Sequence, residues 1–410
     1  MKVLRIHSWD GPVEGGGEDY VQTVSQMLEA QGHPQRIVAI TSRPTDFFGS
    51  QGVNFVVPGT GFRRGLGDSM GTAGLLPLLR RTAQDFEPDI IHLHHFDAGF
   101  SSIAHFLREV RQPILFTAHD AELVCPISTL VLPDGRICEG GVRIRCGLTG
   151  CKVGRGLPLN LWQTRVFDTM VAPRVRGYLC PSRTLRDYLD SNGYRPALHL
   201  PSFAMIPPEV RRAGVSGHER NVPRIGFLGR IEENKGIRFL LEAFARVKQA
   251  KPKALLDLAG EGTATAQFQA MARALDIADC ITWSGWRTGA DKEAWFRNQR
   301  LVVFPSLPFE NFPLVALEAL VRGIPVVATD AGGAKDIVRP GSTGWLVPPS
   351  NPTALADAIL EALRQPEVAE ARAQAGRSMV LTEFTPEVHV ERLRKTYEKV
   401  LAGEPLVPKV

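Results

Sequence analysis

The sequence contains no long hydrophobic run, no internal repeat of fixed period and no low-complexity segment. Its longest apolar stretches, such as Leu75–Leu79 and Val326–Ala328, fall far short of the roughly 20 residues that cross a bilayer. The opening segment MKVLRIHSWD is interrupted by Arg5, His7 and Asp10, where a secretory signal needs a sustained apolar core. The sequence therefore predicts neither a transmembrane helix nor an export signal, and we expect a cytoplasmic protein.

A strong excess of either charge is also missing. The 48 Lys and Arg residues exceed the 43 Asp and Glu residues by only 5 in a chain of 410, which gives no basis for nucleic-acid binding. Hydrophobic residues make up 44% and charged residues 22%, values that exclude a disordered, collagen-like or coiled-coil chain. A globular chain of this length is too long for one core and predicts about two domains.

Short apolar runs alternate with helical patterns in the first half of the chain. Because the apolar runs show no strict polar alternation, they are typical of strands that are covered on both faces. Strands that alternate with helices predict an α/β fold with a doubly wound parallel sheet. The expected strands are 2–6, 36–40, 54–57, 89–94 and 114–119, and the expected helices are 19–31, 72–86 and 98–111.

This alternation stops after Pro201 and starts again at residue 224. Residues 205–222 are rich in proline, glycine and charge, which indicates an interdomain linker. We expect domains at 1–205 and 223–382, with a C-terminal helix at 383–402 that returns to the first domain. Ligands of such domains bind at the carboxyl ends of the strands. In the second half we expect strands at 224–229, 254–260, 280–285, 301–306 and 325–329, and helices at 236–250, 265–275 and 313–322.

Two cations follow the first expected strand of the second domain. In GFLGRIEENKG (226–236), Arg230 comes just after the strand and Lys235 lies at the start of a helix. Cations beside the free N–H groups of a helix terminus suit a diphosphate. A solvated Arg and Lys at a helix start is the alternative interpretation of this fragment.

Two glutamates frame the next candidate segment, PSLPFENFPLVALEALVRGIPVVAT (305–329). Glu310 lies in the loop after a strand, Pro313 suits the first helical turn, and Glu318 falls near the second turn. Carboxylates accept hydrogen bonds from the vicinal hydroxyls of a sugar or a ribose. The alternative is an exposed Glu near a helix N-terminus and an ordinary helical Glu. In DAGGAKDIV (330–338), a pair of glycines precedes another helix, where the backbone can approach a phosphate.

The ordered set of these motifs resembles a family-4 retaining glycosyltransferase of the GT-B fold, with two Rossmann-like domains facing a cleft. In the first domain, GGGEDY (15–20), DIIHLHH (89–95) and TAHD (117–120) resemble that family's glycine-rich loop, cleft strand and active-site histidine region. The resemblance covers nearly the whole chain. It implies a hexosyltransferase that uses a nucleoside-diphosphate sugar and retains the anomeric configuration.

The resemblance also implies roles for individual residues. His119 would face the transferred sugar and Glu310 would bind its hydroxyls, so these two form the catalytic set. Arg230 and Lys235 would hold the diphosphate, and Glu318 the ribose. Gly16, Leu314, Gly332 and Gly333 complete the donor-binding set that the resemblance implies.

The chain departs from the family pattern in three positions. Asn311 and Pro313 stand where the family usually has glycines, and Asp336 stands where it more often has Glu. Because proline has no N–H, a contact made there by a glycine amide is lost or shifted. These differences concern the identity of the sugar more than the activity.

No Asp-x-Asp triplet occurs in the chain, so the usual metal–diphosphate ligand of the other large glycosyltransferase class is missing. We expect catalysis without a cofactor, by positioning and by charge stabilisation of the leaving diphosphate. No convincing carboxylate nucleophile is present, which favours a same-face reaction assisted by the leaving phosphate. His119 is either part of this site or a core histidine near Phe116.

Four of the six cysteines cluster after His119. In a cytosolic chain they are expected to be reduced. Four thiolates in a glycine-rich insertion of about 125–151 favour one structural zinc, and some members of the family carry a similar insertion. Buried or oxidisable thiols are the alternative, because no C-x-x-C occurs. The four candidate zinc ligands are Cys125, Cys138, Cys146 and Cys151, whereas Cys180 and Cys280 are expected to be core residues.

Charge is lopsided around this insertion. Residues 136–186 contain ten basic and two acidic side chains, beside Leu157, Leu159, Leu161 and Trp162. Such a face can contact anionic lipid headgroups or a polyprenyl-diphosphate-linked acceptor, so we expect peripheral membrane contact at the inner face of the membrane. A solvated basic surface is the alternative.

Three functions therefore stay open at this level. The leading one is transfer of a hexose from a nucleoside-diphosphate sugar to a glycan or lipid-linked acceptor in cell-surface polysaccharide or glycolipid synthesis. A sugar-nucleotide epimerase of the same architecture and a non-catalytic sugar-nucleotide-binding protein are the alternatives.

Overall fold

The computed structural model describes residues 1–9, 16–41, 48–56, 74–95, 99–125, 127–132, 137–141, 145–151, 157–212, 223–307 and 309–407. The chain forms two compact units. The first comprises Met1–Pro201 together with Pro386–Val410, and the second comprises Ser202–Thr385. Predicted features that fall on other residues, such as Gly15 of GGGEDY and part of the cysteine-rich insertion, lie outside the described residues.

The first unit is built on a parallel sheet. In the described residues its seven strands lie in the order β3-β2-β1-β4-β5-β6-β7, so the chain moves outward from β1 in one direction and then from β4 in the other. The strands are β1 (Val3–Trp9), β2 (Gln35–Thr41), β3 (Gly52–Val56), β4 (Ile90–Leu93), β5 (Ile114–Thr117), β6 (Val175–Cys180) and β7 (Ala197–His199).

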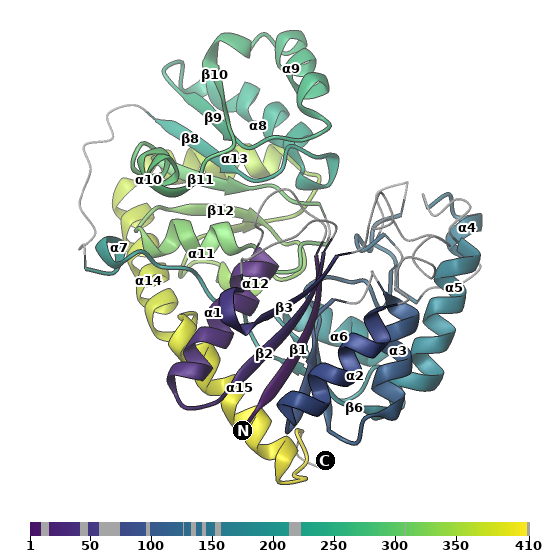
Figure 1. Cartoon of the computed structure of the whole chain (residues 1–410). Helices are drawn as coiled ribbons and strands as arrows, with labels where there is room; N and C mark the ends of the chain where they lie inside the picture. Colours follow the sequence, from purple (N-terminus) through teal and green to yellow (C-terminus); the bar gives the residue numbers. More distant parts are fainter. Residues whose placement is uncertain are drawn as a thin grey trace. The chain divides into compact units, whose positions relative to one another are not determined.

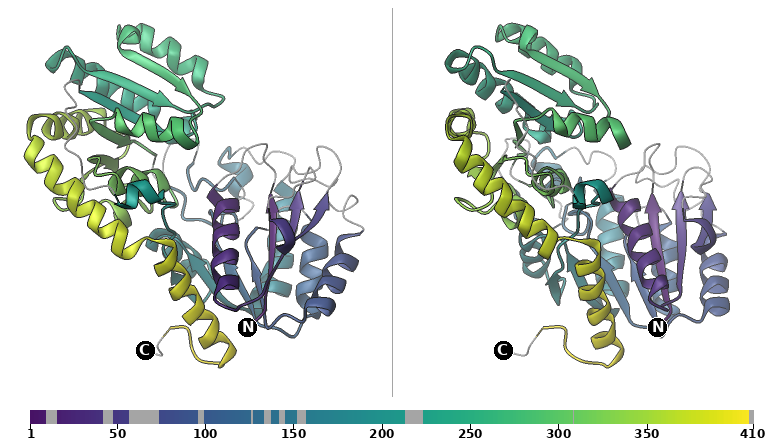
Figure 2. Two further views of the ribbon diagram at one scale, coloured as in Figure 1. Left: turned by 60° about the vertical axis from the view of Figure 1, so that its left-hand side comes forward. Right: turned by 90° about the vertical axis from the view of Figure 1, so that its left-hand side faces the viewer.

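Helices cover both faces of this sheet. Figures 1 and 2 show α1 and α15 together on one face and α2 and α3 on the other. The helices α1 and α15 pack against each other, although they stand at opposite ends of the chain. The helices of this unit are α1 (Gly16–Ala30), α2 (Leu75–Phe86), α3 (Phe100–Glu109), α4 (Arg145–Leu148), α5 (Leu157–Val166), α6 (Arg183–Ser191) and α15 (Pro386–Leu401).

The second unit repeats the plan with six parallel strands in the described residues, in the order β10-β9-β8-β11-β12-β13. The strands are β8 (Arg224–Leu228), β9 (Leu255–Ala259), β10 (Ile281–Gly285), β11 (Leu301–Phe304), β12 (Val326–Thr329) and β13 (Trp345–Val347). The helices are α7 (Pro208–Arg212), α8 (Ile237–Ala250), α9 (Thr265–Ala274), α10 (Gly289–Arg297), α11 (Leu314–Val321), α12 (Ala334–Ile337), α13 (Pro352–Arg364) and α14 (Pro366–Glu383).

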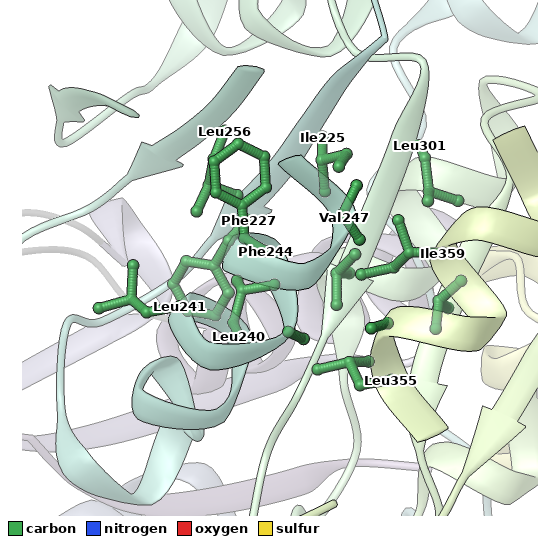
Figure 3. Packing of buried hydrophobic residues seen from close by; sticks show 14 of the residues in the cluster. Ile225, Phe227, Leu240, Leu241, Phe244, Val247, Leu256, Leu301, Leu355 and Ile359 are labelled. Atoms are coloured by element: carbon green, nitrogen blue, oxygen red, sulfur yellow. The ribbon is translucent and has the colours of Figure 1, made fainter. Parts of the chain in front are cut away.

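The core of the second unit has two layers, one on each face of its sheet. Leu301 and Val303 of β11 pack with α8, α9 and α13, and Figure 3 shows part of this layer around Phe244 and Ile359. The alternate residues Val302 and Phe304 pack with α10, α11 and α14 on the other face. Because successive strand residues point to opposite faces, a strand covered on both sides must be apolar throughout. This is why these strands were recognisable as unbroken apolar runs.

The predicted strands and helices are present, with ends shifted by one to three residues. Three of the described strands were not predicted from the sequence. In β6, Arg176 and Gly177 interrupt the apolar run, and β7 and β13 have only three residues each. No helix in the described ranges combines the length and the apolar composition that a membrane span requires.

The segment that we interpreted as a linker is structured over its described part. It contains α7, and Arg377 of α14 donates hydrogen bonds to the carbonyl oxygens of Val210 and Arg211 at 3.0 and 3.3 Å. These bonds attach the segment to the second unit, in which residues from Ser202 onward are included. The rest of the segment, 213–222, lies outside the described residues.

Candidate active site

The predicted donor-binding residues lie where the strand order of the second sheet reverses. The strand β8 has β9 on one side and β11 on the other, and this is the position at which open α/β sheets bind ligands. Arg230 follows the end of β8, and Lys235 ends the short 3-10 helix Glu233–Lys235. Glu310 lies in the loop between β11 and α11, and Gly332 lies between β12 and α12. Three neighbouring strands thus deliver these residues to one edge.

Lys235 and Glu310 form an ion pair. The Lys235 Nζ atom donates to Glu310 Oε2 at 2.6 Å, and Ser306 Oγ donates to the same oxygen at 2.8 Å. The two side chains are 21% and 17% exposed, so the pair is partly shielded and still open to solvent. A charge-assisted bond of this kind fixes the carboxylate while leaving both groups accessible to a ligand.

The glycine turn holds the backbone of Glu310. The amide of Gly333 donates to the carbonyl oxygen of Glu310 at 2.7 Å. Gly332 has φ +55°, and a Cβ atom there would lie 2.1 Å from the same oxygen. Only glycine therefore permits this close approach. The sequence predicts that the two glycines form a phosphate-binding turn, and in the structure this turn contacts the Glu310 loop.

Glu318 forms a second ion pair on α11. Lys292 Nζ donates to Glu318 Oε1 at 2.6 Å. The other oxygen, Oε2, is buried and has no hydrogen-bond partner among the described residues. A buried carboxylate oxygen without a donor is costly, and a hydroxyl of a bound ligand would satisfy it.

The remaining predicted residues of this unit occupy the same edge. The guanidinium of Arg230 is exposed, with Glu232 as a neighbouring carboxylate. Leu314 is the first residue of α11 and is half-buried. Pro313 precedes the first helical turn instead of lying in it, because its carbonyl oxygen accepts the amide of Ala316 at 2.9 Å as an N-terminal cap.

In the first unit, His119 follows β5, is half-buried and is hydrogen-bonded to a network of buried polar side chains. His94 Nδ1 lies 3.0 Å from His119 Nε2, and His94 Nε2 lies 3.1 Å from Arg5 Nη1. Arg5 Nη1 also lies 3.1 Å from His92 Nδ1. Because side chains alternate along a strand, Arg5 within β1, His92 within β4 and the residues that follow β4 and β5 lie on one face of the sheet. The pairing of Arg5 with His92 in the β1–β4 register fixes their alignment.

Burial keeps the histidines of this network neutral. It lowers the pKa of His119 well below the ordinary value of 6.5, and the nearby His95 and His7 lower it further. Burial also lowers the pKa of His92 and His94 well below 6.5, and the charge of Arg5 contributes to both shifts. The rings of His92 and His94 are stacked, with centroids 4.3 Å apart. These histidines therefore remain unprotonated at neutral pH.

The helices α1 and α15 complete the network. Tyr20 of α1 lies with its ring centroid 5.2 Å from that of His119, and its hydroxyl is 2.7 Å from His389 Nε2 on α15. His7 Nε2 lies 3.3 Å from Glu18 Oε1. Burial opposes ionisation of Glu18, but its hydrogen bond with His7 holds the carboxyl pKa below the usual value. Gly16, the predicted donor-binding glycine, is the first residue of α1.

Most of this network was not predicted from the sequence. Arg5 and His7 served only as interruptions of an apolar run, and Tyr20 and His389 had no predicted role. One signal was available, because a cation in the middle of a buried strand carries a large desolvation cost unless the fold gives it partners. The partners themselves lie up to 89 residues away in the chain, where no local pattern shows them.

In its described residues, the cysteine-rich insertion shows no group of metal-ligating side chains. All six cysteines are free, and no three His, Cys, Asp or Glu side chains in the described ranges are grouped as metal ligands would be. Instead, Cys138 Sγ accepts the amide of Gly140 at 3.4 Å, Cys146 Sγ donates to Gly141 O at 3.9 Å, and Cys151 Sγ lies 3.5 Å from Thr149 Oγ1. Cys125 is buried, and burial raises the pKa of its thiol. Cys180 is buried in β6, whereas Cys280 precedes β10 and packs at the edge of the core.

Two family descriptions match the chain. Residues 14–200 match "Glycosyltransferase Family 4", and residues 212–379 match "Glycosyl transferases group 1". Similar curated proteins include phosphatidyl-myo-inositol mannosyltransferase of Mycobacterium leprae, 24% identical over 406 residues, which cover 98% of this chain and 97% of that protein. D-inositol 3-phosphate glycosyltransferase of Corynebacterium jeikeium is 27% identical over 440 residues, covering 98% and 97%.

The fold is also similar to that of solved structures. The crystal structure of HepE from Anabaena in complex with UDP and glucose superposes with a TM-score of 0.70 at 19% identity, covering 97% of this chain and 100% of that one. The architecture of two parallel α/β sheets is that of the GT-B glycosyltransferases. The chain therefore joins a Glycosyltransferase Family 4 domain to a glycosyl transferases group 1 domain on the GT-B fold.

Proposed function

We propose that the protein is a retaining hexosyltransferase that moves a sugar from a nucleoside-diphosphate donor to a glycan or lipid-linked acceptor. The observation that carries this proposal is the juxtaposition of Lys235 and Glu310 at the carboxyl edge of the second sheet. One group suits a phosphate and the other suits sugar hydroxyls. The Lys235 Nζ and Glu310 Oε2 atoms are 2.6 Å apart, so the phosphate and the neighbouring sugar of one ligand could reach both side chains.

The donor is assigned group by group. Lys235 and the exposed Arg230 would bind the diphosphate, and Glu310 the hydroxyls of the transferred sugar. Glu318 would accept a hydroxyl of the ribose through Oε2, the buried oxygen without a partner in the described structure. The similarity to HepE, solved with UDP and glucose, supports a nucleoside-diphosphate sugar as the class of donor.

The chemistry would depend on charge at the leaving group. As the bond to the diphosphate breaks, negative charge develops on the phosphate oxygens, and the two cations stabilise it without a metal ion. Attack on the same face, assisted by the leaving phosphate, accounts for retention without a carboxylate nucleophile. We propose that the imidazole of His119, neutral because it is buried, contacts the sugar as a hydrogen-bonding group and not as a cation.

A lipid-linked acceptor and peripheral membrane contact belong to the same proposal. One of the mycobacterial relatives is named a phosphatidyl-myo-inositol mannosyltransferase, and phosphatidyl-myo-inositol is a lipid. Around the insertion, Leu148, Ile137 and Trp162 expose 83%, 51% and 47% of their surface, on the segment that the sequence marks as basic. Such side chains suit the inner face of an anionic membrane. Cosedimentation with anionic but not with neutral vesicles would support this contact.

The structural zinc stays a prediction from the sequence. Elemental analysis of reduced, active protein tests it, with about one zinc per chain expected and a loss of that zinc in Cys138→Ser. Active protein without zinc would assign the four cysteines to ordinary thiols and leave the transferase proposal intact.

The decisive experiment is a product assay. Purified protein is incubated with a panel of nucleotide sugars and lipid-linked or glycan acceptors, and the products are identified by mass spectrometry. We expect a product whose mass exceeds that of an acceptor by one hexose. Conversion of the donor sugar without any acceptor would indicate an epimerase, and tight nucleotide binding without any product would indicate a binding protein.

A further inference from the structure

Arg5 is a fully buried cation whose acceptors are all neutral. Its side chain contacts Gln35 Oε1 at 3.2 Å, His92 Nδ1 at 3.1 Å and His94 Nε2 at 3.1 Å. In the described part of the chain no carboxylate forms an ion pair with it. Burying a charge without a counter-ion is expensive, and core packing alone would be better served by an apolar residue. A buried charge retained beside a candidate active site is a sign of function.

The hydrogen bonds of Arg5 determine where the protons of two histidines lie. A guanidinium has only donors, so each ring nitrogen that faces it must be an acceptor. Nη1 carries two hydrogens, one for His92 Nδ1 and one for His94 Nε2. Neutral His92 therefore carries its proton on Nε2, which donates to Thr117 Oγ1 at 2.8 Å. Neutral His94 carries its proton on Nδ1.

The proton on His94 Nδ1 in turn determines the state of His119. His94 Nδ1 lies 3.0 Å from His119 Nε2, so His94 donates and His119 Nε2 accepts. A neutral imidazole with one accepting nitrogen has its proton on the other. His119 is thereby the Nδ1–H tautomer. Protonation of either ring is opposed by burial, which lowers the pKa of both His94 and His119.

Gln35, the first residue in this series of hydrogen bonds, is itself held by backbone carbonyl oxygens. Gln35 Nε2 donates to the carbonyl oxygens of His33 and Pro34 at 2.8 and 3.2 Å. The amide can make these bonds only with its nitrogen toward the backbone, so Oε1 must face Arg5 Nε. The guanidinium is therefore held by β2 on one side and by β4 on the other.

We propose that Arg5 is a positioning residue that, acting through His94, holds His119 as the Nδ1–H tautomer, so that Nδ1–H is the donor which the ring presents to the transferred sugar. This rests on the proposed function for its last step, because that step requires a sugar substrate. The tautomer itself does not depend on it. A ring of the opposite tautomer would present a lone pair at Nδ1, so it could accept from a sugar hydroxyl but could not donate to a sugar oxygen.

The test uses the full-length protein labelled with ¹⁵N only in histidine. Long-range ¹H–¹⁵N correlation spectra distinguish protonated from unprotonated ring nitrogens, and comparison with His119→Gln assigns the His119 signals. We expect the Nδ1–H pattern for His119 in the wild type. In Arg5→Met we expect this pattern to be lost and kcat to fall roughly tenfold, the effect of one hydrogen bond. Affinity for the free nucleoside diphosphate should not change, because its proposed site lies in the second unit.

A pair of variants at His94 keeps the test decisive if Arg5→Met does not fold. The amide of His94→Gln can accept from Arg5 and donate to His119, whereas His94→Leu can do neither. We expect the Gln variant to keep the tautomer and most of kcat, and the Leu variant to lose both. Arg36→Met is the matched control, because Arg36 lies on the adjacent strand β2, donates to the carbonyl oxygen of Ser50 at 3.2 Å and lies over the ring of Phe86, away from the histidines.

The outcomes separate the two proposals. An Nε2–H tautomer of His119 in the folded wild type overturns the role of Arg5. So does an unchanged Nδ1–H tautomer in folded Arg5→Met and His94→Leu. If the tautomer follows the variants as expected but no protein transfers sugar to any acceptor, the positioning network stands and the proposed function fails.

Discussion

The carboxyl edges of the two sheets hold their polar side chains in different electrostatic states. In the second unit, Lys235–Glu310 and Lys292–Glu318 are ion pairs at 2.6 Å whose side chains are between 13% and 26% exposed. In the first unit, Arg5, His92 and His94 are fully buried, and the histidines are neutral. Both edges nevertheless lie at the reversal of strand order in a parallel sheet.

This difference shows how one topology can serve two tasks. Partly exposed ion pairs can exchange a protein partner for a ligand group of the same charge at small cost. A buried network cannot exchange protons or partners easily, but it can hold a ring in one orientation and one tautomer. We therefore assign ligand charge recognition to the second unit and positioning to the first. Four predictions test that division, in order of decreasing effect.

The largest effect is expected at Glu310. Replacing Glu310 with Gln removes the charge that we propose binds sugar hydroxyls, and we expect turnover to fall roughly 10²–10³-fold, as for the loss of one strong polar contact in a transition state. Affinity for the free nucleoside diphosphate should change little. Steady-state assays and calorimetry measure the two quantities. Glu383→Gln is the control, because Glu383 also forms an ion pair, with Arg339 at 2.7 Å, and its side chain is more exposed than that of Glu310. Wild-type turnover in Glu310→Gln would remove Glu310 from the site.

The next effect is expected at the two cations. Lys235→Ala and Arg230→Ala should each weaken binding of a nucleoside diphosphate by about 1.5–3 kcal/mol, the range for a hydrogen bond to a charged group. Calorimetry measures the affinity, and thermal unfolding checks that each variant is folded. The exposed Arg238 on α8 provides the control variant Arg238→Ala. Unchanged affinity in both test variants would refute the assignment of the diphosphate.

A smaller effect separates geometry from charge in the second unit. Gly332 and Gly341 both have positive φ, +55° and +72°, but only Gly332 has a backbone atom where a Cβ would be placed. Gly341→Ala should cost about 1–2 kcal/mol for its backbone conformation alone. Gly332→Ala should cost about 1–3 kcal/mol more from the clash with Glu310 O, and should also reduce transfer. Chemical unfolding measures both variants. Equal losses of stability would show that the turn does not hold the Glu310 loop.

The smallest effect on transfer is expected from a test of the first unit that measures the pH dependence of its stability. Burial lowers the pKa of His389 from 6.5 to about 4. Between these values the unfolded chain binds a proton that the folded chain does not, so this contribution to stability is complete above pH 6.5 and is lost as the pH falls toward 4. The expected slope is about 1.4 kcal/mol per pH unit.

The variant His389→Gln measures this slope. Its amide can still accept from Tyr20 and donate to Pro201 O, as His389 does at 2.7 Å in each case, but it does not titrate. Urea unfolding followed by circular dichroism between pH 4.5 and 6.5 should show a shallower pH dependence than in the wild type. His105→Gln on the exposed side of α3 is the control. An identical pH dependence in wild type and His389→Gln would mean that His389 is not held neutral.

Much of the fold was predictable because its strands are covered on both faces. The runs IVAI (37–40) and LVVF (301–304) are apolar throughout, which is the condition of a central parallel strand, and both form strands. The strand β7 could not be predicted in this way, because three residues carry too little pattern. The candidate site in the second unit was also predictable, since Lys235, Glu310 and the glycine turn belong to loops that directly follow strands.

What the sequence by itself determined is therefore local: the α/β class, the strand and helix segments, and the loops that carry Arg230, Glu310 and His119. Only the tertiary structure decided which side chains meet. Arg5 and His94 are 89 positions apart, and His92 and Tyr397 are 305 apart, yet each pair is hydrogen-bonded. The periodicity of apolar residues indicates which face of a helix or strand is buried. A partner for a buried polar group depends instead on strand order and on the return of α15 to the first sheet, and both are set by the packing of the whole chain.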